Sequence, residues 1–544
     1  MTTTSSITRH DFLRYLGGGA AALLAGQPAA AASPPASSDF EPDLALELTA
    51  ARHSIALRPG AETRTWSYRA RVLKGDPTSM QELPGSYLGP VLRVRRGQRV
   101  RIDLLNQLDQ PSIVHWHGLH VPETMDGHPR FVVPPSGRYR YEFEVRNRAG
   151  TYWYHPHPHG HTGEQVYFGL AGLLLVTDEE EQALALPRGE YDLPIVIQDR
   201  SFDGDNQFRY LPGTGPAAAR GDRSGEAPAM GGAMMSGGGM MGGRMMSGGM
   251  GSMMARMAGF LGDTILINGQ PNHTLDVATR PYRLRILNGS NTRIYKLAWQ
   301  DGRPLTVIGT DGGLLERPMR RDYVMLAPAE RIELWADFSR DAVGARRVLM
   351  SLAFEDSMGT MGSMMGGTGL PAGAPFPLVE VRVARKASEV LELPQRLSTI
   401  TWPRIGDAVN RARPRTFRIT LSGMQWGING RSFEMTAVAP DEAVKLGTTE
   451  IWEFINDSGM MTMAHSMHVH DRQFQVLERH SGADGEGVRD GYVDQGLKDT
   501  VLVMPGDRVK LLMHFDDYTG LFLYHCHMLE HEDGGLMRNY QVQA

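Results

Sequence analysis

This chain of 544 residues has a single cysteine, no large excess of positive or negative charge, and no apolar segment near its N-terminus that is long enough to cross a bilayer. The single cysteine, Cys526, excludes disulfide bonds within the chain, so packing and bound metal must stabilise the fold. Lysines and arginines number 56 against 61 aspartates and glutamates, so we expect neither nucleic acid nor a membrane surface as a partner. The apolar run at residues 15–25 is too short to span a bilayer, and we therefore predict no membrane span.

Glycine, methionine and histidine are abundant instead, with 63, 31 and 19 copies. At roughly 100–200 residues per domain, the length predicts three or four domains. Residues 1–32 combine Arg9 and Arg14, an apolar stretch and a run of small residues, which is typical of an export signal. The segment is similar to a twin-arginine signal, although His10 replaces the second arginine. We therefore expect an exported protein, either periplasmic or extracellular.

A strand, a tight turn and a second strand, all of period two, recur at 91–102, 325–334 and 503–512. Self-similarity at a spacing of about 200 residues indicates duplicated domains, and such strands without long helical stretches predict an all-β fold of Greek-key sandwiches or barrels. We place the three domains at 45–188, 190–385 and 410–544. Two Gly/Met-rich segments, 229–257 and 357–367, interrupt the pattern and contain too much glycine to be strands.

Ten of the 19 histidines fall in four short motifs, at 115–118, 155–157, 465–470 and 525–531. A lone His-x-His doublet could equally be a zinc pair or two surface imidazoles. Four doublets change this interpretation, because residues i and i+2 of a strand point to the same face and each doublet aims two imidazoles into one space. The motifs therefore predict a cluster of eight inward imidazoles.

Cys526 lies between His525 and His527, and strand alternation places its side chain on the opposite face. If the two histidines serve one metal site, the thiolate serves another across the same strand. A thiolate completed by His465 and His531 is a trigonal set of two histidines and one cysteine, which is typical of blue copper. Structural zinc would need a closed tetrahedron of ligands, so we predict copper rather than zinc or iron.

These motifs resemble the four copper signatures of the multicopper oxidase family, which includes bacterial laccases and the cuprous oxidases of copper tolerance. His-Trp-His-Gly at 115–118, Trp-Tyr-His-Pro-His-Pro-His-Gly at 153–160, His-x-x-His-x-His at 465–470 and His-Cys-His-x-x-x-His-Glu at 525–532 follow in the family's order. The resemblance covers residues from about 45 to 544. It implies three cupredoxin-like domains, in agreement with the repeats.

The resemblance also implies four copper ions: one of type 1, one of type 2 and a binuclear type 3 pair. Type 1 copper would be bound by His465, Cys526 and His531, and type 2 copper by His115 and His468. The type 3 pair would be bound by His117, His155 and His527 on one ion and by His157, His470 and His525 on the other. The trinuclear cluster would then lie between the first and third domains, with the second domain as a spacer.

The family's chemistry is the one-electron oxidation of phenolic or aromatic compounds or of Cu(I), coupled to the four-electron reduction of O2 to water. The resemblance thus implies a small-molecule or metal-ion electron donor and dioxygen as partners, and the complete ligand set predicts a monomer. Asp126 and Glu532 resemble the acidic residues that relay protons to the cluster in this family. The alternative is an ordinary solvated or turn carboxylate at each position.

Two positions beside the predicted type 1 site depart from the copper-tolerance type. Leu536 stands at the axial position, five residues after His531, where that type has methionine. The missing thioether donor should raise the redox potential of the copper. Met537 is expected on the opposite side of the chain, unless a bulge at the two preceding glycines brings its sulfur to the copper. Ser466 replaces a proline, which leaves the rigidity of the ligand loop open.

The methionine-rich insertion lies in the second predicted domain, whereas copper-tolerance oxidases carry theirs in the third. Its thioethers and those of the shorter loop are soft ligands that suit Cu(I), and the alternative is a flexible linker. The candidates for Cu(I) binding are Met234, Met235, Met240, Met241, Met245, Met246, Met358, Met361, Met364 and Met365. Further methionines beside His465 either favour copper binding or pack around the type 1 site, namely Met460, Met461, Met463 and Met467.

Three other functions compete with that of a laccase or cuprous oxidase. In a copper-sequestering protein of copper tolerance, the methionine-rich loops would bind Cu(I) and turnover would be secondary. A copper-free relative on this fold would have lost ligands, whereas all ten motif histidines and Cys526 are present. A ferroxidase would have acidic residues at the rim of the type 1 site, which the sequence does not show near His465.

Overall fold

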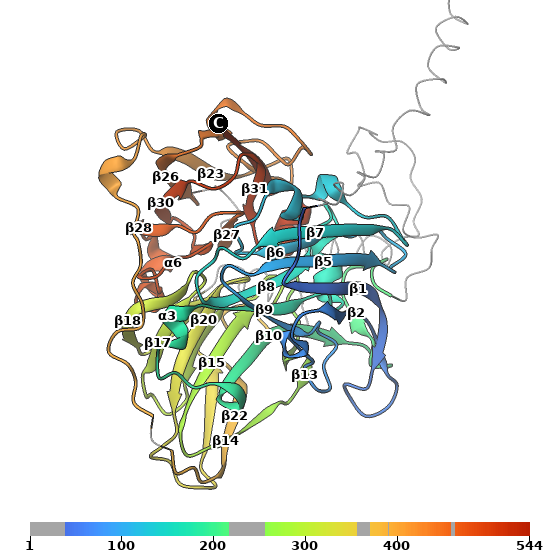
Figure 1. Cartoon of the computed structure of the whole chain (residues 1–544), viewed down its shortest axis with the longest axis vertical. Helices are drawn as coiled ribbons and strands as arrows, with labels where there is room; N and C mark the ends of the chain where they lie inside the picture. The colour runs from blue at the N-terminus through green and yellow to red at the C-terminus, as the bar shows by residue number, and fades with distance from the viewer. Residues whose placement is uncertain (1–38, 217–255, 356–369, 390, 458–462) are drawn as a thin grey trace, which may run out of the picture.

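The computed structural model describes residues 39–216, 256–355, 370–389, 391–457 and 463–544. The export signal predicted at 1–32 and most of the two Gly/Met-rich segments lie outside these residues. Within the described part the strands form six sheets, two from each successive part of the chain (Figure 1). The prediction of an all-β fold is therefore confirmed. No helix in these described ranges is long and apolar enough to cross a membrane.

The first pair of sheets has the strand orders β2-β1-β5-β7 and β3-β4-β9-β8-β6. Its strands are β1 (Leu44–Ile55), β2 (Thr63–Lys74), β3 (Met80–Gln81), β4 (Val91–Arg95), β5 (Arg99–Asn106), β6 (Val114–His117), β7 (Arg138–Glu144), β8 (Gly150–Pro156) and β9 (Gly172–Thr177). Alternate residues of β5 are buried, as expected of a strand with one face on the core. β8 is buried along its whole length, which requires that both of its faces are covered.

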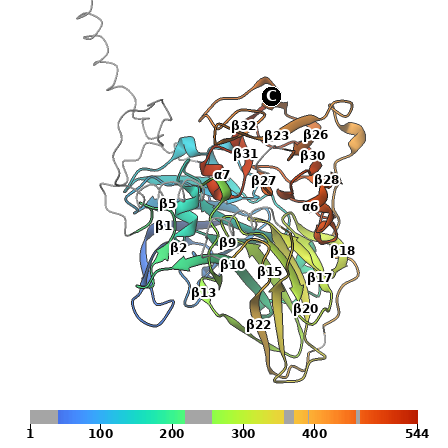
Figure 2. The same ribbon diagram turned by 180° about the vertical axis from the view of Figure 1, so that it is seen from behind.

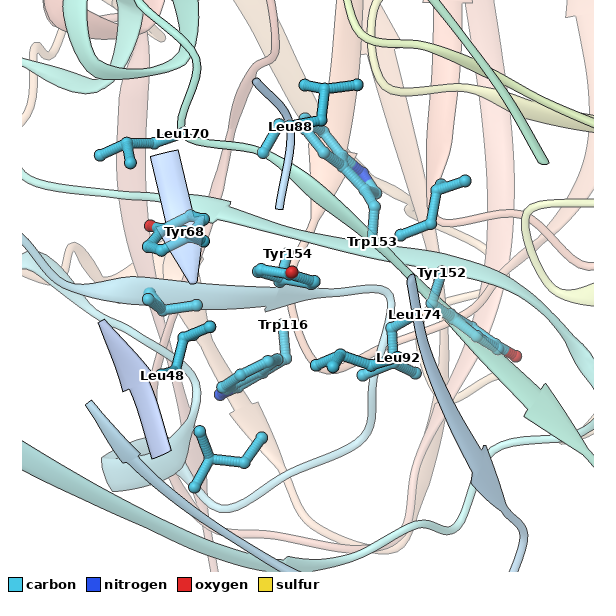
Figure 3. Packing of buried hydrophobic residues seen from close by; sticks show 14 of the residues in the cluster. Leu48, Tyr68, Leu88, Leu92, Trp116, Tyr152, Trp153, Tyr154, Leu170 and Leu174 are labelled. Atoms are coloured by element: carbon cyan, nitrogen blue, oxygen red, sulfur yellow. The ribbon is translucent and has the colours of Figure 1, made fainter. Parts of the chain in front are cut away.

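Aromatic rings and leucine side chains together fill the core between these two sheets (Figure 3). Trp116 of β6 packs against Tyr154 of β8, with the ring centroids 5.7 Å apart. Because Trp116 points into this core, strand alternation turns His115 and His117 to the opposite face. The same alternation turns His155 away from Tyr154. Packing of two aromatic side chains thus fixes the direction in which three imidazoles point.

The second pair of sheets comes from the middle of the chain, with the orders β13-β12-β10-β15-β20-β17-β18 and β14-β22-β21-β16-β19, and β11 pairs with β10. Its strands are β10 (Asp192–Phe202), β11 (Phe208–Arg209), β12 (Thr264–Ile267), β13 (Gln270–Pro271), β14 (Thr274–Ala278), β15 (Pro281–Asn288), β16 (Tyr295–Trp299), β17 (Leu305–Thr310), β18 (Gly313–Arg321), β19 (Val324–Leu326), β20 (Arg331–Asp337), β21 (Arg346–Ser351) and β22 (Phe376–Arg385). Arg283 and Arg285 of β15 donate to Glu333 of β20 at 2.6 and 2.9 Å. Thr151 of β8 donates to the same carboxylate at 2.7 Å, which ties the second pair of sheets to the first.

The third pair of sheets has the orders β24-β23-β26-β30-β28 and β25-β32-β31-β27-β29. Its strands are β23 (Arg415–Ser422), β24 (Gln425–Ile428), β25 (Ala443–Lys445), β26 (Thr448–Ile455), β27 (His465–Val469), β28 (Gln475–His480), β29 (Thr500–Val503), β30 (Arg508–Phe515), β31 (Gly520–Cys526) and β32 (Met537–Gln543). Figure 1 shows this pair, in orange and red, at the top, with the yellow-green second pair below it and the blue-to-teal first pair beside both.

Short helices connect the strands. The α-helices with both ends in the described part are α2 (Thr162–Tyr167), α3 (Glu179–Gln182), α6 (Ala483–Glu486) and α7 (Leu529–Asp533), and residues 256–258 are helical as well. The 3₁₀ turns are η1 (Pro77–Ser79), η2 (Glu123–Met125), η3 (Pro129–Phe131), η4 (Gly189–Tyr191), η5 (Ile405–Asp407), η6 (Pro440–Glu442) and η7 (Arg489–Gly491). Figure 2 shows α7 beside β31, and α7 contains His531, the last histidine of the fourth motif.

Candidate metal centres

Strand pairing brings the four histidine motifs together. β6 pairs with β8 so that His115 lies opposite His155, and β27 pairs with β31 so that His468 lies opposite His525. The first of these strand pairs belongs to the N-terminal part of the chain and the second to the C-terminal part. All ten motif histidines are at most 1% exposed. The imidazoles therefore meet inside the protein, out of contact with bulk water.

Five of the eight inward imidazoles form two groups of close contacts between the first and third pairs of sheets. His115 Nε2 lies 3.4 Å from His468 Nε2, and these are the two residues predicted to hold type 2 copper. His155 Nε2 lies 3.4 Å from His117 Nδ1 and 3.3 Å from His527 Nε2. These three histidines are the ones predicted for one ion of the type 3 pair.

The remaining three imidazoles meet around His525. Its Nε2 atom lies 3.3 Å from His157 Nε2 and 3.0 Å from His470 Nε2. The possible ligand atoms of these three residues all lie within 4.8 Å of one another. Like the other two groups, this one draws imidazoles from both ends of the chain. The structure thus brings the eight histidines of the predicted cluster together. Contacts also run between the predicted sets, since the rings of His115 and His470 are stacked with centroids 3.8 Å apart. The division of the imidazoles among single ions therefore stays a prediction.

A separate group of donors lies on the other face of β31. Cys526 Sγ lies 3.5 Å from His465 Nδ1 and 3.7 Å from His531 Nδ1, and the two nitrogens are 3.3 Å apart. Ligands bound to one ion at about 2.0–2.3 Å in a trigonal plane would lie about 3.5–3.8 Å from one another, so these donors fit a metal ion. Trp426 packs against both imidazoles, with ring centroids 4.9 and 4.8 Å away.

Leu536 and Met537 lie on different sides of the chain. Leu536 belongs to the buried apolar cluster that contains Cys526, whereas Met537 packs with Phe433 in another cluster. Met537 begins β32, where it is paired with His525, and the register is regular from there to Val542. Leu536 is therefore the residue on the side of the thiol, as strand alternation predicts.

Burial sets the protonation of the Cys526 group when no cation is present. It raises the pKa of Cys526 to about 12, so the thiol stays neutral at pH 7 unless a positive charge lies beside it. It lowers the pKa of His531 to about 3 and the pKa of His465 well below its ordinary value, so both imidazoles are neutral. Neutral imidazoles are the form that binds metal, and a metal cation would stabilise a buried thiolate. The chemistry of the three donors thus fits a bound metal ion.

Asp126 and Glu532 lie against the eight imidazoles. Asp126 Oδ2 accepts a hydrogen bond from His470 Nδ1 at 2.7 Å, and its backbone carbonyl accepts one from His115 Nδ1 at 2.6 Å. Glu532 Oε2 lies 3.1 Å from His525 Nδ1. Both carboxyl side chains are at most 1% exposed, so neither is an ordinary solvated carboxylate.

Two charged residues that the sequence did not point to also lie beside the imidazoles, Asp499 in direct contact and Arg331 through Asp499. Asp499 Oδ1 lies 3.1 Å from His117 Nε2, and Arg331 of β20 donates to the same oxygen at 2.7 Å. Neither residue belongs to a histidine motif, and they are 168 positions apart in the chain. Nothing in the sequence marked them as neighbours of the cluster.

The other residues predicted near the type 1 site have mixed outcomes. Ser466, at the position of the family's proline, donates from Oγ to the carbonyl of Pro328 at 2.7 Å and so ties β27 to the second pair of sheets. Met463 and Met467 are buried in the apolar core of the third pair of sheets. Met460, Met461 and all ten candidates for Cu(I) binding lie outside the described residues.

Comparisons with known proteins relate this chain to copper-dependent oxidases. Two sequence models described as multicopper oxidase match residues 65–181 and 408–544. The multicopper oxidase mco of Staphylococcus haemolyticus is 30% identical over 459 residues, which cover 84% of this chain and 83% of that protein. The laccase of Bacillus subtilis is 28% identical over 516 residues, covering 86% of this chain and 90% of that protein.

Solved structures are similar over nearly the whole chain. The McoA multicopper oxidase of Aquifex aeolicus has 32% identity and a TM-score of 0.71, and the match covers 93% of this chain and 97% of that one. The laccase-like multicopper oxidase CueO of Ochrobactrum sp. has 26% identity and a TM-score of 0.70, covering 94% and 100%.

This chain belongs to the multicopper oxidase family. It is accordingly an oxidoreductase with copper as cofactor and O2 as electron acceptor, built on cupredoxin-like sheets. The copper-sequestering alternative is not favoured, because the relatives described above are named as oxidases or laccases.

Proposed function

We propose that this chain is a laccase-like oxidase that couples the one-electron oxidation of phenolic or aromatic compounds or of Cu(I) to the four-electron reduction of O2 to water. The observation that carries this proposal is the placement of Cys526 and its two histidine neighbours on opposite faces of one strand. An oxidase of this kind needs a donor-oxidising site and an O2 site that are separate yet close. Adjacent residues with opposed side chains meet both requirements.

We propose that four copper ions are held by the groups described above. Type 1 copper would be held by His465, Cys526 and His531, and type 2 copper by His115 and His468. One ion of the type 3 pair would be held by His117, His155 and His527. The other would be held by His157, His470 and His525. The short distances within each group support this assignment. Bound copper would supply four one-electron carriers, the number that complete reduction of one O2 to water requires.

The chain's own residues orient the imidazoles and supply protons in this proposal. Asp126 holds the Nδ1 hydrogen of His470, which leaves the Nε2 atom of that ring free for a metal. His525 Nδ1 lies 3.1 Å from the backbone carbonyl of Cys526 and equally 3.1 Å from Glu532 Oε2, so its Nε2 atom is likewise free for a metal. Both carboxyl groups are buried next to the cluster, and we propose that they relay protons towards it.

We propose that Leu536 occupies the axial position of the type 1 site. Its side chain lies in the same buried cluster as Cys526, and it offers no donor atom. The absence of a thioether destabilises Cu(II) more than Cu(I), so the redox potential of this copper should be high. A high potential widens the range of phenols that the site can oxidise.

Three broader features complete the proposal. The division into domains at 45–188, 190–385 and 410–544 is supported by the one pair of sheets found within each range. A functional monomer is supported by the fact that one chain supplies every donor. Export to the periplasm or the cell exterior is supported by the pattern of an export signal at 1–32. Cu(I) binding in copper tolerance is supported by the abundance of methionine in the two Gly/Met-rich segments.

Copper analysis, an absorption spectrum and oxygen uptake on the full chain test this function. We expect four copper ions per chain, an intense blue thiolate-to-copper band, and O2 uptake with a phenol, with Cu(I), or with both. The Cys526→Ser variant is the control, since it should take up no O2 with either donor. Stoichiometric copper in the unaltered protein without O2 uptake from either donor would contradict the proposal and favour sequestration.

A further inference from the structure

Asp499 makes contact with two histidines of the cluster through different atoms. Its Oδ1 atom lies 3.1 Å from His117 Nε2, and its backbone carbonyl lies 2.7 Å from His468 Nδ1. A carbonyl can only accept, so the proton of His468 is on Nδ1 and its Nε2 atom, which faces His115, carries a lone pair. A carboxylate likewise accepts from His117 Nε2, which leaves the lone pair of that ring on Nδ1, the atom nearest His155.

Arg331 fixes the position of Asp499 from the second pair of sheets. Its guanidinium donates to both carboxylate oxygens, from Nη1 to Oδ1 at 2.7 Å and from Nη2 to Oδ2 at 2.5 Å. The remaining hydrogens go to three backbone carbonyls, those of Thr151, Ala329 and Asp311, at 3.0–3.1 Å. All five guanidinium hydrogens therefore have an acceptor, and such a two-pronged ion pair fixes both the position and the orientation of the carboxylate.

Packing leaves this ion pair no room to shift. Both side chains are fully buried. Gly118, directly after His117, adopts a φ of +89°, and a Cβ atom there would lie 2.5 Å from Asp499 Oδ2 and 2.9 Å from Arg331 Nη2. The glycine of the first histidine motif thus makes space for the two charged groups. Any movement of Arg331 would be passed to Asp499, and from it to His117.

We propose that Arg331 and Asp499 are positioning residues of the trinuclear site, in which Arg331 orients Asp499 and Asp499 fixes the tautomers and ring directions of His117 and His468. This inference rests on the proposed function, because it needs copper at those histidines. It gives the middle of the chain a part in the metal site, since Arg331 is the first residue of β20. The pair acts through the imidazoles and contacts neither O2 nor the electron donor.

Three variants of the full-length protein, loaded with copper and compared with the unaltered chain, test the proposal. Asp499→Asn removes the charge, Arg331→Gln removes the two-pronged contact, and Arg331→Lys keeps the positive charge but cannot form the fork. In the first two, copper affinity at the histidine cluster should fall by about 10–100-fold, as is typical when a hydrogen-bond partner of a metal ligand is lost. The type 2 electron paramagnetic resonance signal and the near-ultraviolet type 3 band should change, while the blue band stays intact. The lysine variant should lose less affinity than the glutamine variant.

Arg293→Gln is the matched control, because Arg293 is an equally buried arginine of the middle segment that donates to Asp199 at 2.9 Å and contacts no imidazole. It should be destabilised, as expected when a buried ion pair is broken, yet keep its copper affinity and spectra. Copper affinity and type 2 spectra in Asp499→Asn and Arg331→Gln equal to those of the control would overturn the inference. If these two variants do not fold, Arg331→Lys decides, and an unaltered type 2 signal in it rejects the positioning role. A native chain with no copper at the histidine cluster would instead refute the proposed function itself.

Discussion

His525 and Cys526 are neighbours in β31, yet their side chains belong to different groups of ligand atoms. His525 Nε2 lies 3.0 Å from His470 Nε2 in the cluster, whereas Cys526 Sγ lies 3.5 Å from His465 Nδ1 on the other face of the strand. Because the two side chains point to opposite faces of the strand, a substitution in one group removes no donor from the other.

Replacing Cys526 by serine should abolish the intense blue absorption and the oxidase activity. A hydroxyl is not a soft charge-transfer ligand, whereas its size allows the buried site to stay packed. Copper analysis and absorption spectroscopy check this, and circular dichroism confirms that the sheets persist. We expect the near-ultraviolet band of the histidine cluster to remain. A blue band in the serine variant would exclude Cys526 as the type 1 ligand.

Replacing His157 by alanine should have the opposite effect on the blue absorption, but it should also stop the oxidase activity. This imidazole contacts His525 in the cluster and no residue of the Cys526 group, so the blue band should persist while O2 uptake falls to background. Reduction of the blue band by a phenol under nitrogen should remain normal, because it requires only the type 1 site. Oxygen uptake at the rate of the unaltered protein would show that the ligand assignment is wrong.

Leu536→Met should lower the redox potential of the type 1 copper. The added thioether is a weak donor that stabilises Cu(II), so the oxidation of poorly reducing phenols should slow. Redox titration of the blue band measures the shift. Met537→Leu is the control, since Met537 packs in the other cluster with Phe433 and should leave the potential unchanged. A potential that moves in the Met537 variant and not in the Leu536 variant would reverse the assignment.

Gly118→Ala should both destabilise the protein and weaken the binding of copper at the cluster. An alanine at positive φ costs about 1–2 kcal/mol, and here its Cβ would also collide with the carboxylate of Asp499. Gly97→Ala isolates the backbone cost, because Gly97 has a φ of +79° with nothing within 4 Å of the added carbon. Thermal unfolding midpoints and bound copper are the measurements. Equal copper content in both alanine variants would show that the space at residue 118 does not matter for the site.

The sequence predicted those parts of the site that depend on strand alternation. The opposed directions of His525 and Cys526, and of Leu536 and Met537, follow from a period of two residues and agree with the structure. Arg331 and Asp499 could not be found in this way. Arg331 begins β20 in the second pair of sheets, whereas Asp499 directly precedes β29 in the third. No local periodicity predicts which distant side chains will meet. The hydrogen bond from Ser466 to the carbonyl of Pro328 could not be predicted either, since it depends on how the second and third pairs of sheets pack together.

The ion pair between Arg331 and Asp499 beside the cluster bears on when copper can bind during folding. Asp499 meets Arg331 from 168 positions away and His117 from 382 positions away, so its final surroundings exist only after all three parts of the chain have docked. A half-folded chain would present imidazoles without the geometry that holds them. We therefore expect the cluster to accept copper in its native geometry only after all three parts of the chain have docked.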